Sequence, residues 1–171
     1  MRLKVFLFLW ACIGLFFSLH AQDYERSAGL RLGNTSGLTY KDFFNQDEAI
    51  ELLLSGRRDG LQLTTLYVFH KPLELAFNEN FYLYYGIGAH VGYEEYGGFS
   101  KVLTSIDPPS FLFERKTFFV MGADAILGVE YRWFTVPVTV GFDVKPRFTF
   151  IGMRYTDTKF WDAAVSVKYI F

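Results

Sequence analysis

Residues 119–133 read FVMGADAILGVEYRW and alternate strictly between two kinds of side chain. The odd positions are apolar or aromatic, whereas the even positions include Asp124, Glu130 and Arg132. Because successive side chains of a β-strand point to opposite faces, this period of two predicts a strand whose faces meet different environments. The last residues, 159–171, repeat the pattern with apolar residues at every second position. The fold is therefore expected to be all-β.

The same alternation recurs through most of the remaining chain. It predicts eight strands, with the expected ranges 24–33, 37–44, 49–58, 61–70, 80–93, 117–132, 135–147 and 159–171. Pro137 and Pro146 are expected at the two ends of the seventh strand, because proline cannot donate to a ladder of hydrogen bonds. Long loops are expected at one end, over 94–116 and 148–158, and short turns at the other, over 45–48, 71–79 and 133–134. This arrangement predicts an eight-stranded antiparallel up-and-down barrel of the transmembrane kind.

Composition limits the classes of protein to which the chain can belong. It has 171 residues, of which 51% are hydrophobic, 20% aromatic and 20% charged, with a formal net charge of −1. This is the length of one domain. The apolar content excludes an intrinsically disordered chain, and the lack of a basic excess excludes a nucleic-acid-binding protein. Asp124 interrupts the longest apolar run beyond residue 21, so a membrane-spanning helix is not expected there.

Residues 1–21 read MRLKVFLFLWACIGLFFSLHA and form the pattern of a secretory signal peptide, with Ala21 before the cleavage point. Two alternatives stay open. The apolar stretch from Val5 to Leu19 is short for a transmembrane anchor, and Leu9 to Cys12 loosely resembles a lipoprotein-processing motif. Cleavage after Ala21 leaves residues 22–171 as an exported barrel domain without cysteine, so no thiol or disulfide chemistry is expected.

Alternation alone does not decide which face of the strands is inside the barrel. Aromatic pairs end the apolar face of three strands at the same expected end, at Tyr67 and Phe69, Tyr131 and Trp133, and Tyr169 and Phe171. This alignment is typical of the aromatic girdle of a membrane barrel, to which we assign Tyr67, Phe69, Tyr131 and Trp133. The apolar face is therefore expected to meet lipid, and the polar face to fill the lumen. The expected polar network of the lumen comprises Arg31, Glu51, Arg57, His90, Asp124, Glu130, Arg132, Asp143, Lys145 and Lys168.

The C-terminal segment resembles the recognition strand of bacterial outer-membrane barrels, on which the barrel assembly machinery acts. The matching positions are Trp161, Val165, Val167, Tyr169 and Phe171. The chain beyond residue 21 is similar to small barrels of the outer membrane protein A and X type. Residues 29–33 (GLRLG), 37–41 (GLTYK) and 144–148 (VKPRF) resemble small uncharacterised outer-membrane proteins of Bacteroidetes-type bacteria. The resemblance implies an outer-membrane location, contact with membrane lipid and lipopolysaccharide, and the barrel assembly machinery as a partner during biogenesis. It implies no particular activity.

Candidate catalytic residues are few. His70 and His90 are the histidines that remain after cleavage. Barrel hydrolases, by resemblance, place a serine two residues from a catalytic histidine, whereas Val68, Pro72, Gly88 and Gly92 occupy those positions here. The residue spacing of an EF-hand or a zinc site is also missing. We therefore expect no catalytic residue, no cofactor and no metal.

The segment 94–116 is expected to be a prominent external loop, with Phe99, Phe111 and Phe113 as its aromatic residues. Exposed aromatic residues can form the site of a surface partner. They can also fold over the barrel mouth or reach lipid head groups, and both interpretations stay open.

The predicted function is that of a monomeric integral outer-membrane barrel with a side-chain-filled lumen, in a structural or surface-interaction role. A general porin is not expected, because eight strands leave no aqueous channel. Two alternatives remain, a lipid-processing barrel enzyme and a soluble periplasmic carrier of the lipocalin type.

Overall fold

The computed structural model describes residues 25–57, 60–74, 80–101, 111–133, 135–151, 155–159 and 161–171. The side chains at 57, 96–101, 111–116, 151, 155–157 and 159 are not described. The expected signal peptide, residues 1–21, lies outside the described residues, and so does Cys12. The strands are β1 (Arg26–Gly33), β2 (Ser36–Phe43), β3 (Glu48–Arg57), β4 (Gly60–Pro72), β5 (Phe81–Lys101), β6 (Phe111–Arg132), β7 (Val138–Val144), β8 (Arg147–Ile151), β9 (Tyr155–Lys159) and β10 (Ala163–Ile170).

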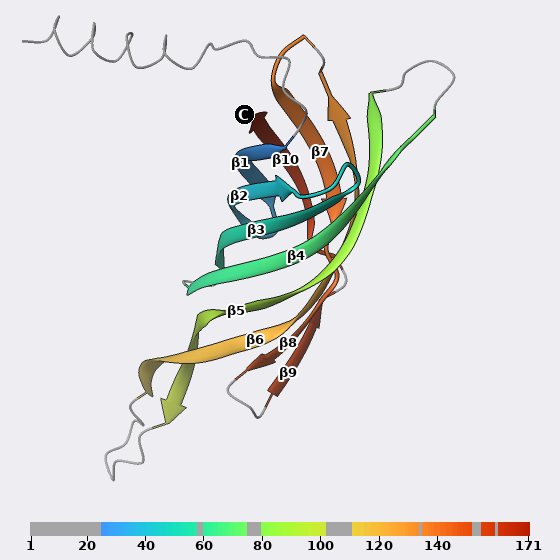
Figure 1. Cartoon of the computed structure of the whole chain (residues 1–171). Coiled ribbons are helices and arrows are strands. Elements are labelled where there is room, and N and C mark those ends of the chain that lie inside the picture. Colours follow the sequence, from blue (N-terminus) through green and yellow to red (C-terminus); the bar gives the residue numbers. More distant parts are fainter. Residues whose placement is uncertain are drawn as a thin grey trace, which may run out of the picture.

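Neighbouring strands pair antiparallel and close into a barrel (Figure 1). From β1 to β6 each strand pairs with the next, β10 pairs with both β1 and β7, and β7 pairs with β6. β7 and β8 pair with consecutive parts of β6, so β8 continues the course of β7. On their other side, β10 pairs with β7 and β9 pairs with β8. Each of these two pairs of segments therefore forms one barrel strand with an interruption. The predicted all-β, eight-stranded antiparallel barrel is confirmed.

The two prolines fall at different kinds of position in the seventh barrel strand. Pro137 directly precedes β7, as expected, but Pro146 lies at the interruption between β7 and β8. The ladder changes partners there, because the Lys145 N–H donates to the Asp162 carbonyl at 3.0 Å and the Pro146 carbonyl accepts from the Ala125 N–H at 2.9 Å. The prediction that this strand ends at residue 147 is wrong. The missing proline N–H interrupts the strand without ending it.

The expected long loops are also largely strand. β5 and β6 continue past the predicted boundaries and pair from Glu94↔Phe118 to Lys101↔Phe111. β8 and β9 occupy most of the segment 148–158. The alternation that defines the other strands is broken by Gly97 and Gly98 in the first segment and confined to five-residue pieces in the second. The alternation of apolar and polar residues in these two segments was therefore too short or too irregular to predict the additional strand residues.

Burial places the polar face of the strands inside the barrel. Along β4, Gln62, Thr64 and His70 are buried, whereas Leu61 and Leu63 on the alternate positions are exposed. A small apolar cluster also lies inside, formed by Leu53, Leu66, Val68, Tyr84 and Ile126. Large apolar side chains cover the outside, and Ile87, for example, is 70% exposed. Among the residues that the structure describes, no helix is long and apolar enough to cross a membrane.

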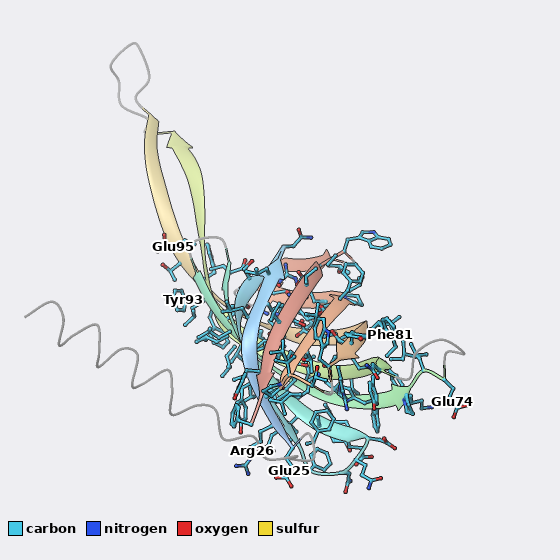
Figure 2. All side chains as sticks on the ribbon, turned by 90° about the horizontal axis from the view of Figure 1, so that it is seen from above. Glu25, Arg26, Glu74, Phe81, Tyr93 and Glu95 are labelled. Atoms are coloured by element: carbon cyan, nitrogen blue, oxygen red, sulfur yellow. The ribbon has the colours of Figure 1, made fainter. Side chains whose placement is uncertain are left out.

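The two ends of the barrel differ in height. The terminal end carries the first residues of β1 and the last residues of β10, and the Phe171 N–H donates to the Arg26 carbonyl there at 3.0 Å. The hairpin end carries the paired tips of β5 and β6, which run well beyond the rest of the barrel (Figures 1 and 2). These two names are used below for the two ends.

Candidate functional site

Charged side chains of both signs fill the interior of the barrel. The described residues place five cationic and six acidic side chains there in buried positions, namely Arg31, Lys41, Lys145, Arg147 and Lys168, and Glu51, Glu94, Asp124, Glu130, Asp143 and Asp162. Arg132 is partly buried beside them. Unpaired burial of a charge costs several kcal/mol. The near balance of signs is therefore what allows this interior to form.

One cluster lies towards the terminal end and centres on two glutamates. Lys168 Nζ lies 2.6 Å from Glu51 Oε1, and the Thr39 hydroxyl donates to the same oxygen at 2.6 Å. Lys41 Nζ lies 3.4 Å from Glu51 and 3.2 Å from Glu130. Arg132 Nε donates to Glu130 at 2.9 Å, and its guanidinium lies 3.8 Å from the ring centre of Tyr82. Residues from β2, β3, β6 and β10 are thus joined across the lumen.

A second cluster lies towards the hairpin end and centres on Arg31. Its Nη2 donates to Asp143 Oδ1 at 2.6 Å, and its Nη1 donates to the carbonyl and the hydroxyl of Thr35, both at 2.8 Å. The Thr35 hydroxyl in turn donates to Asp162 at 2.5 Å. Lys145 Nζ lies between Asp124, at 3.6 Å, and Asp162, at 3.8 Å. The cluster therefore ties the β1–β2 turn to the interruptions in the last two barrel strands.

Tyr84 on β5 connects the two clusters. Its hydroxyl donates to Asp143 Oδ2 at 3.1 Å, and Lys41 Nζ lies 4.7 Å from the centre of its ring. His70 stacks on the same ring with a centroid distance of 5.6 Å. Room for the ring comes from Gly128, where an added Cβ would lie 2.5 Å from Tyr84 Cζ. Glycine at this position is thus required by the close approach of a large neighbour.

His90 on β5 contacts both Asp124 and Thr149 near the hairpin end. Its Nδ1 lies 2.5 Å from Asp124 Oδ2, and its Nε2 lies 3.1 Å from the hydroxyl oxygen of Thr149. A proton on Nδ1 satisfies Asp124 and leaves Nε2 to accept from Thr149. These contacts have the geometry of a hydroxyl nucleophile, a base and an orienting carboxylate. However, Thr149 and His90 are each 1% exposed, so the hydroxyl does not reach the surface of the barrel.

The structure places the expected lumen residues as follows. Arg31, Glu51, His90, Asp124, Glu130, Asp143, Lys145 and Lys168 are buried inside, and Arg132 is partly buried. The side chain of Arg57 lies outside the description. Sequence reasoning did not include Thr35, Tyr84, Thr149 and Asp162 in the network. Thr149 could have been found from the alternation of Phe148 and Phe150 with Arg147 and Thr149.

The expected girdle residues lie on the outside of the barrel at the terminal end. Tyr67 contacts Phe69 with a ring-centroid distance of 5.0 Å, and Tyr131 contacts Trp133 at 4.7 Å. Phe69 also stacks on Tyr85 at 5.6 Å, so the aromatic surface continues from β4 to β5. The positions of the expected assembly signal, Trp161, Val165, Val167, Tyr169 and Phe171, are all exposed on the outer face. Trp161 precedes β10 towards the hairpin end, and its carbonyl accepts from the Asn34 amide at 2.7 Å.

The three phenylalanines expected in an external loop belong to strands. Phe99 on β5 is in register with Phe113 on β6, and Lys101 is in register with Phe111. Their side chains lie outside the description. The structure therefore corrects the predicted loop at 94–101 and 111–116 to paired strands, and residues 102–110 lie outside the described residues.

Neither a metal centre nor a known relative identifies a function for this interior. Within the described part of the chain, no three His, Cys, Asp or Glu side chains are grouped so as to hold a metal ion. Comparisons with protein-family models, with curated proteins and with solved structures found no match.

Proposed function

We propose that this chain is an integral outer-membrane β-barrel with a side-chain-filled lumen and a structural or surface-interaction role. The observation that carries the proposal is the inversion of the barrel, with charges inside and apolar side chains outside. A soluble barrel has the opposite distribution, because water solvates its outer face. Ile87, Leu127, Phe142 and Val167 are all exposed although they lie within strands.

Aromatic residues near both ends of the barrel support a position across a membrane. At the terminal end the outer face carries Tyr67, Trp133 and Tyr169, and at the hairpin end it carries Tyr93, Phe119 and Trp161. Trp161 is 80% exposed. Tyrosine and tryptophan favour the interface between lipid and water, and two belts around an apolar band are typical of membrane barrels. The apolar band between them is suited to contact lipid.

The likeness to small barrels of the outer membrane protein A and X type, and to the Bacteroidetes-type barrels, is part of this proposal. The strand number and the exposed C-terminal pattern ending in Phe171 support it. The corresponding partners are membrane lipid, lipopolysaccharide and, during biogenesis, the barrel assembly machinery. Removal of a signal peptide after Ala21 belongs to the same proposal.

A role as a general porin is not proposed, because the lumen holds paired charges and the Tyr84 ring. Eight-stranded barrels have an interior that side chains fill. Planar-bilayer recordings of the purified protein should show no large, stable conductance. Large, long-lived channels in such recordings would contradict a filled lumen.

Cell fractionation tests the location. The protein should stay with the outer membrane after a carbonate wash, and it should migrate differently in detergent gels before and after heating. Release by carbonate without heat-modifiable migration would instead support a soluble periplasmic carrier of the lipocalin type. The charged interior argues against such a carrier, because a binding cavity for an apolar cargo needs apolar walls.

A lipid-processing enzyme is the second candidate, because Thr149, His90 and Asp124 are connected as a nucleophile, base and carboxylate would be. Incubation of the purified protein with labelled phospholipid and labelled lipid A tests this role. Turnover that is lost in both Thr149→Ala and His90→Asn, and kept in the control His70→Asn, would support the enzyme. We expect no turnover in any of the four proteins, because the Thr149 hydroxyl is buried.

A further inference from the structure

The buried, inward-facing side chains of three strands change from polar to apolar and back to polar along the barrel. From the terminal end to the hairpin end they are Glu51, Leu53 and Ser55 on β3, His70, Val68, Leu66 and Thr64 on β4, and Glu130, Gly128, Ile126 and Asp124 on β6. On each of these strands, apolar side chains therefore separate the polar groups of the terminal end from those of the hairpin end.

These apolar side chains contact one another inside the barrel. With the ring of Tyr84 they form the cluster of Leu53, Leu66, Val68, Tyr84 and Ile126, which we call the apolar layer. The Leu66 side chain lies over Gly88 on β5, where an added Cβ would be 2.8 Å from Leu66 Cδ2. Val68 on β4 and Ile126 on β6 are both in register with Gly86, which has no side chain to separate them. Glycines on β5 thus allow side chains of β4 and β6 to meet.

Tyr84 extends the apolar layer towards the remaining wall of the barrel. Its ring lies against Gly128 on β6, and its hydroxyl would be 3.4 Å from a Cβ added to Gly141 on β7. The hydroxyl donates to Asp143 on β7, which also binds the Arg31 guanidinium from β1. Side chains from both halves of the wall therefore meet across the lumen at the apolar layer.

The polar groups on either side of the apolar layer have hydrogen-bonding capacity left for water. Ser55 Oγ and Gln62 Oε1 on the hairpin side, and His70 Nδ1 and Thr139 Oγ1 on the terminal side, are buried and have no hydrogen-bond partner among the described residues. Buried polar atoms are ordinarily paired with protein or with ordered water. Charged and polar side chains line the pathways of ions, whereas an apolar constriction excludes water and ions. The apolar layer is therefore a stronger barrier than the charged clusters.

We propose that the apolar layer is the seal that stops ions from passing through the lumen, and that the charged clusters on either side of it are not. The inference rests on the proposed membrane location and names the side chains that keep the barrel from conducting. Fractionation tests that location separately. A protein that stays with the membrane after a carbonate wash, but whose variants conduct otherwise than expected below, contradicts this inference alone.

Planar-bilayer recordings of two double variants test the seal. Leu66→Ser with Ile126→Ser opens the layer between β4 and β6 and keeps the Tyr84 hydrogen bond, whereas Leu66→Ser with Tyr84→Ser also removes the large ring. Both replace apolar surface by small hydroxyl side chains that water can solvate. We expect each to gain discrete current steps that the unaltered protein lacks. Heat-modifiable migration shows beforehand which variants are folded, and one folded variant of the two suffices.

Lys168→Ser is the matched control. It removes a long charged side chain from the cluster near the terminal end, leaves Glu51 beside Lys41, and keeps every side chain of the apolar layer. We expect no current steps from this variant. Steps from Lys168→Ser would overturn the proposal, because a charged cluster would then be part of the seal. Silent recordings from the folded variants of the apolar layer would overturn it as well, because the seal would then not depend on these side chains.

Discussion

The hydroxyl of Tyr84 donates a hydrogen bond to Asp143 from across the lumen, at 3.1 Å. Asp143 also accepts from the guanidinium of Arg31, so the Tyr84 hydroxyl belongs to the cluster near the hairpin end. The Tyr84 ring lies close to Lys41 and Lys168 of the other cluster. A single side chain therefore connects the two charged groups of the interior. The two clusters form one network through Tyr84, and their residues should be energetically coupled.

Removal of the Tyr84 hydroxyl should weaken this connection. Tyr84→Phe keeps the ring beneath Lys41 but removes one hydrogen bond to a buried carboxylate, which Arg31 still neutralises. We expect a loss of about 1.5–3 kcal/mol in the free energy of unfolding, the range for a hydrogen bond to a charged group. Urea unfolding of the protein in lipid vesicles measures it. A stability equal to that of the unaltered protein would show that the hydroxyl does not contribute.

Removal of the charge of Glu51 and removal of the charge of Lys168 should lower the free energy of unfolding by different amounts. Both side chains are nearly fully buried, and Glu51 faces two lysines, Lys168 and Lys41. Glu51→Gln leaves both cations without that carboxylate and should cost about 3–5 kcal/mol, the range for breaking a buried ion pair. Lys168→Met leaves Glu51 beside Lys41 and should cost less. The same unfolding measurement compares the two variants, and a larger loss in Lys168→Met would contradict the observed arrangement of charges.

The fold was largely predictable because a barrel gives each strand two different environments. Residues 119–133 and 159–171 alternate so clearly that their strands follow from the period of two. The extension of β5 to Lys101 was not predictable in this way, because Gly97 and Gly98 interrupt the pattern. Backbone pairing with β6 still holds these residues in a strand, and pairing between distant segments is not visible in local composition.

The members of the interior network were easier to predict than their partners. Alternation alone places Asp124, Glu130 and Lys168 on one face of their strands, but which of them meet depends on the register between strands. Thr149 reaches His90 because β8 continues along β6 beyond the interruption at Pro146. The contact therefore depends on a break in the ladder of hydrogen bonds, and no motif in the sequence indicates it.

The contact between Thr149 and His90 should be structural. Thr149→Val keeps the shape of the side chain but leaves the buried Nε2 of His90 without its described partner. We expect a loss of about 1–3 kcal/mol in the free energy of unfolding, the cost of leaving a buried polar group unsatisfied. Thr149→Ser keeps the hydroxyl and serves as the control, with a smaller loss. A loss in Thr149→Val no larger than that in Thr149→Ser, which keeps the hydroxyl and lacks only the methyl group, would show that the hydrogen bond does not determine the stability.

A lysine on the outer face tests the membrane proposal directly, because it should destabilise a barrel whose outer face meets lipid and should not destabilise one whose outer face meets water. Ile87 lies in the middle of β5, in register with Tyr67 and Ala125, and is 70% exposed. If this face meets lipid, Ile87→Lys should lower the free energy of unfolding in lipid vesicles by about 2–4 kcal/mol, because a charged side chain on the lipid face destabilises a membrane barrel. Ile87→Leu, which keeps an apolar side chain of the same size, should fold as the unaltered protein does. If the face meets water, the lysine would instead increase solubility without detergent at no cost in stability, and that result would exclude the membrane location.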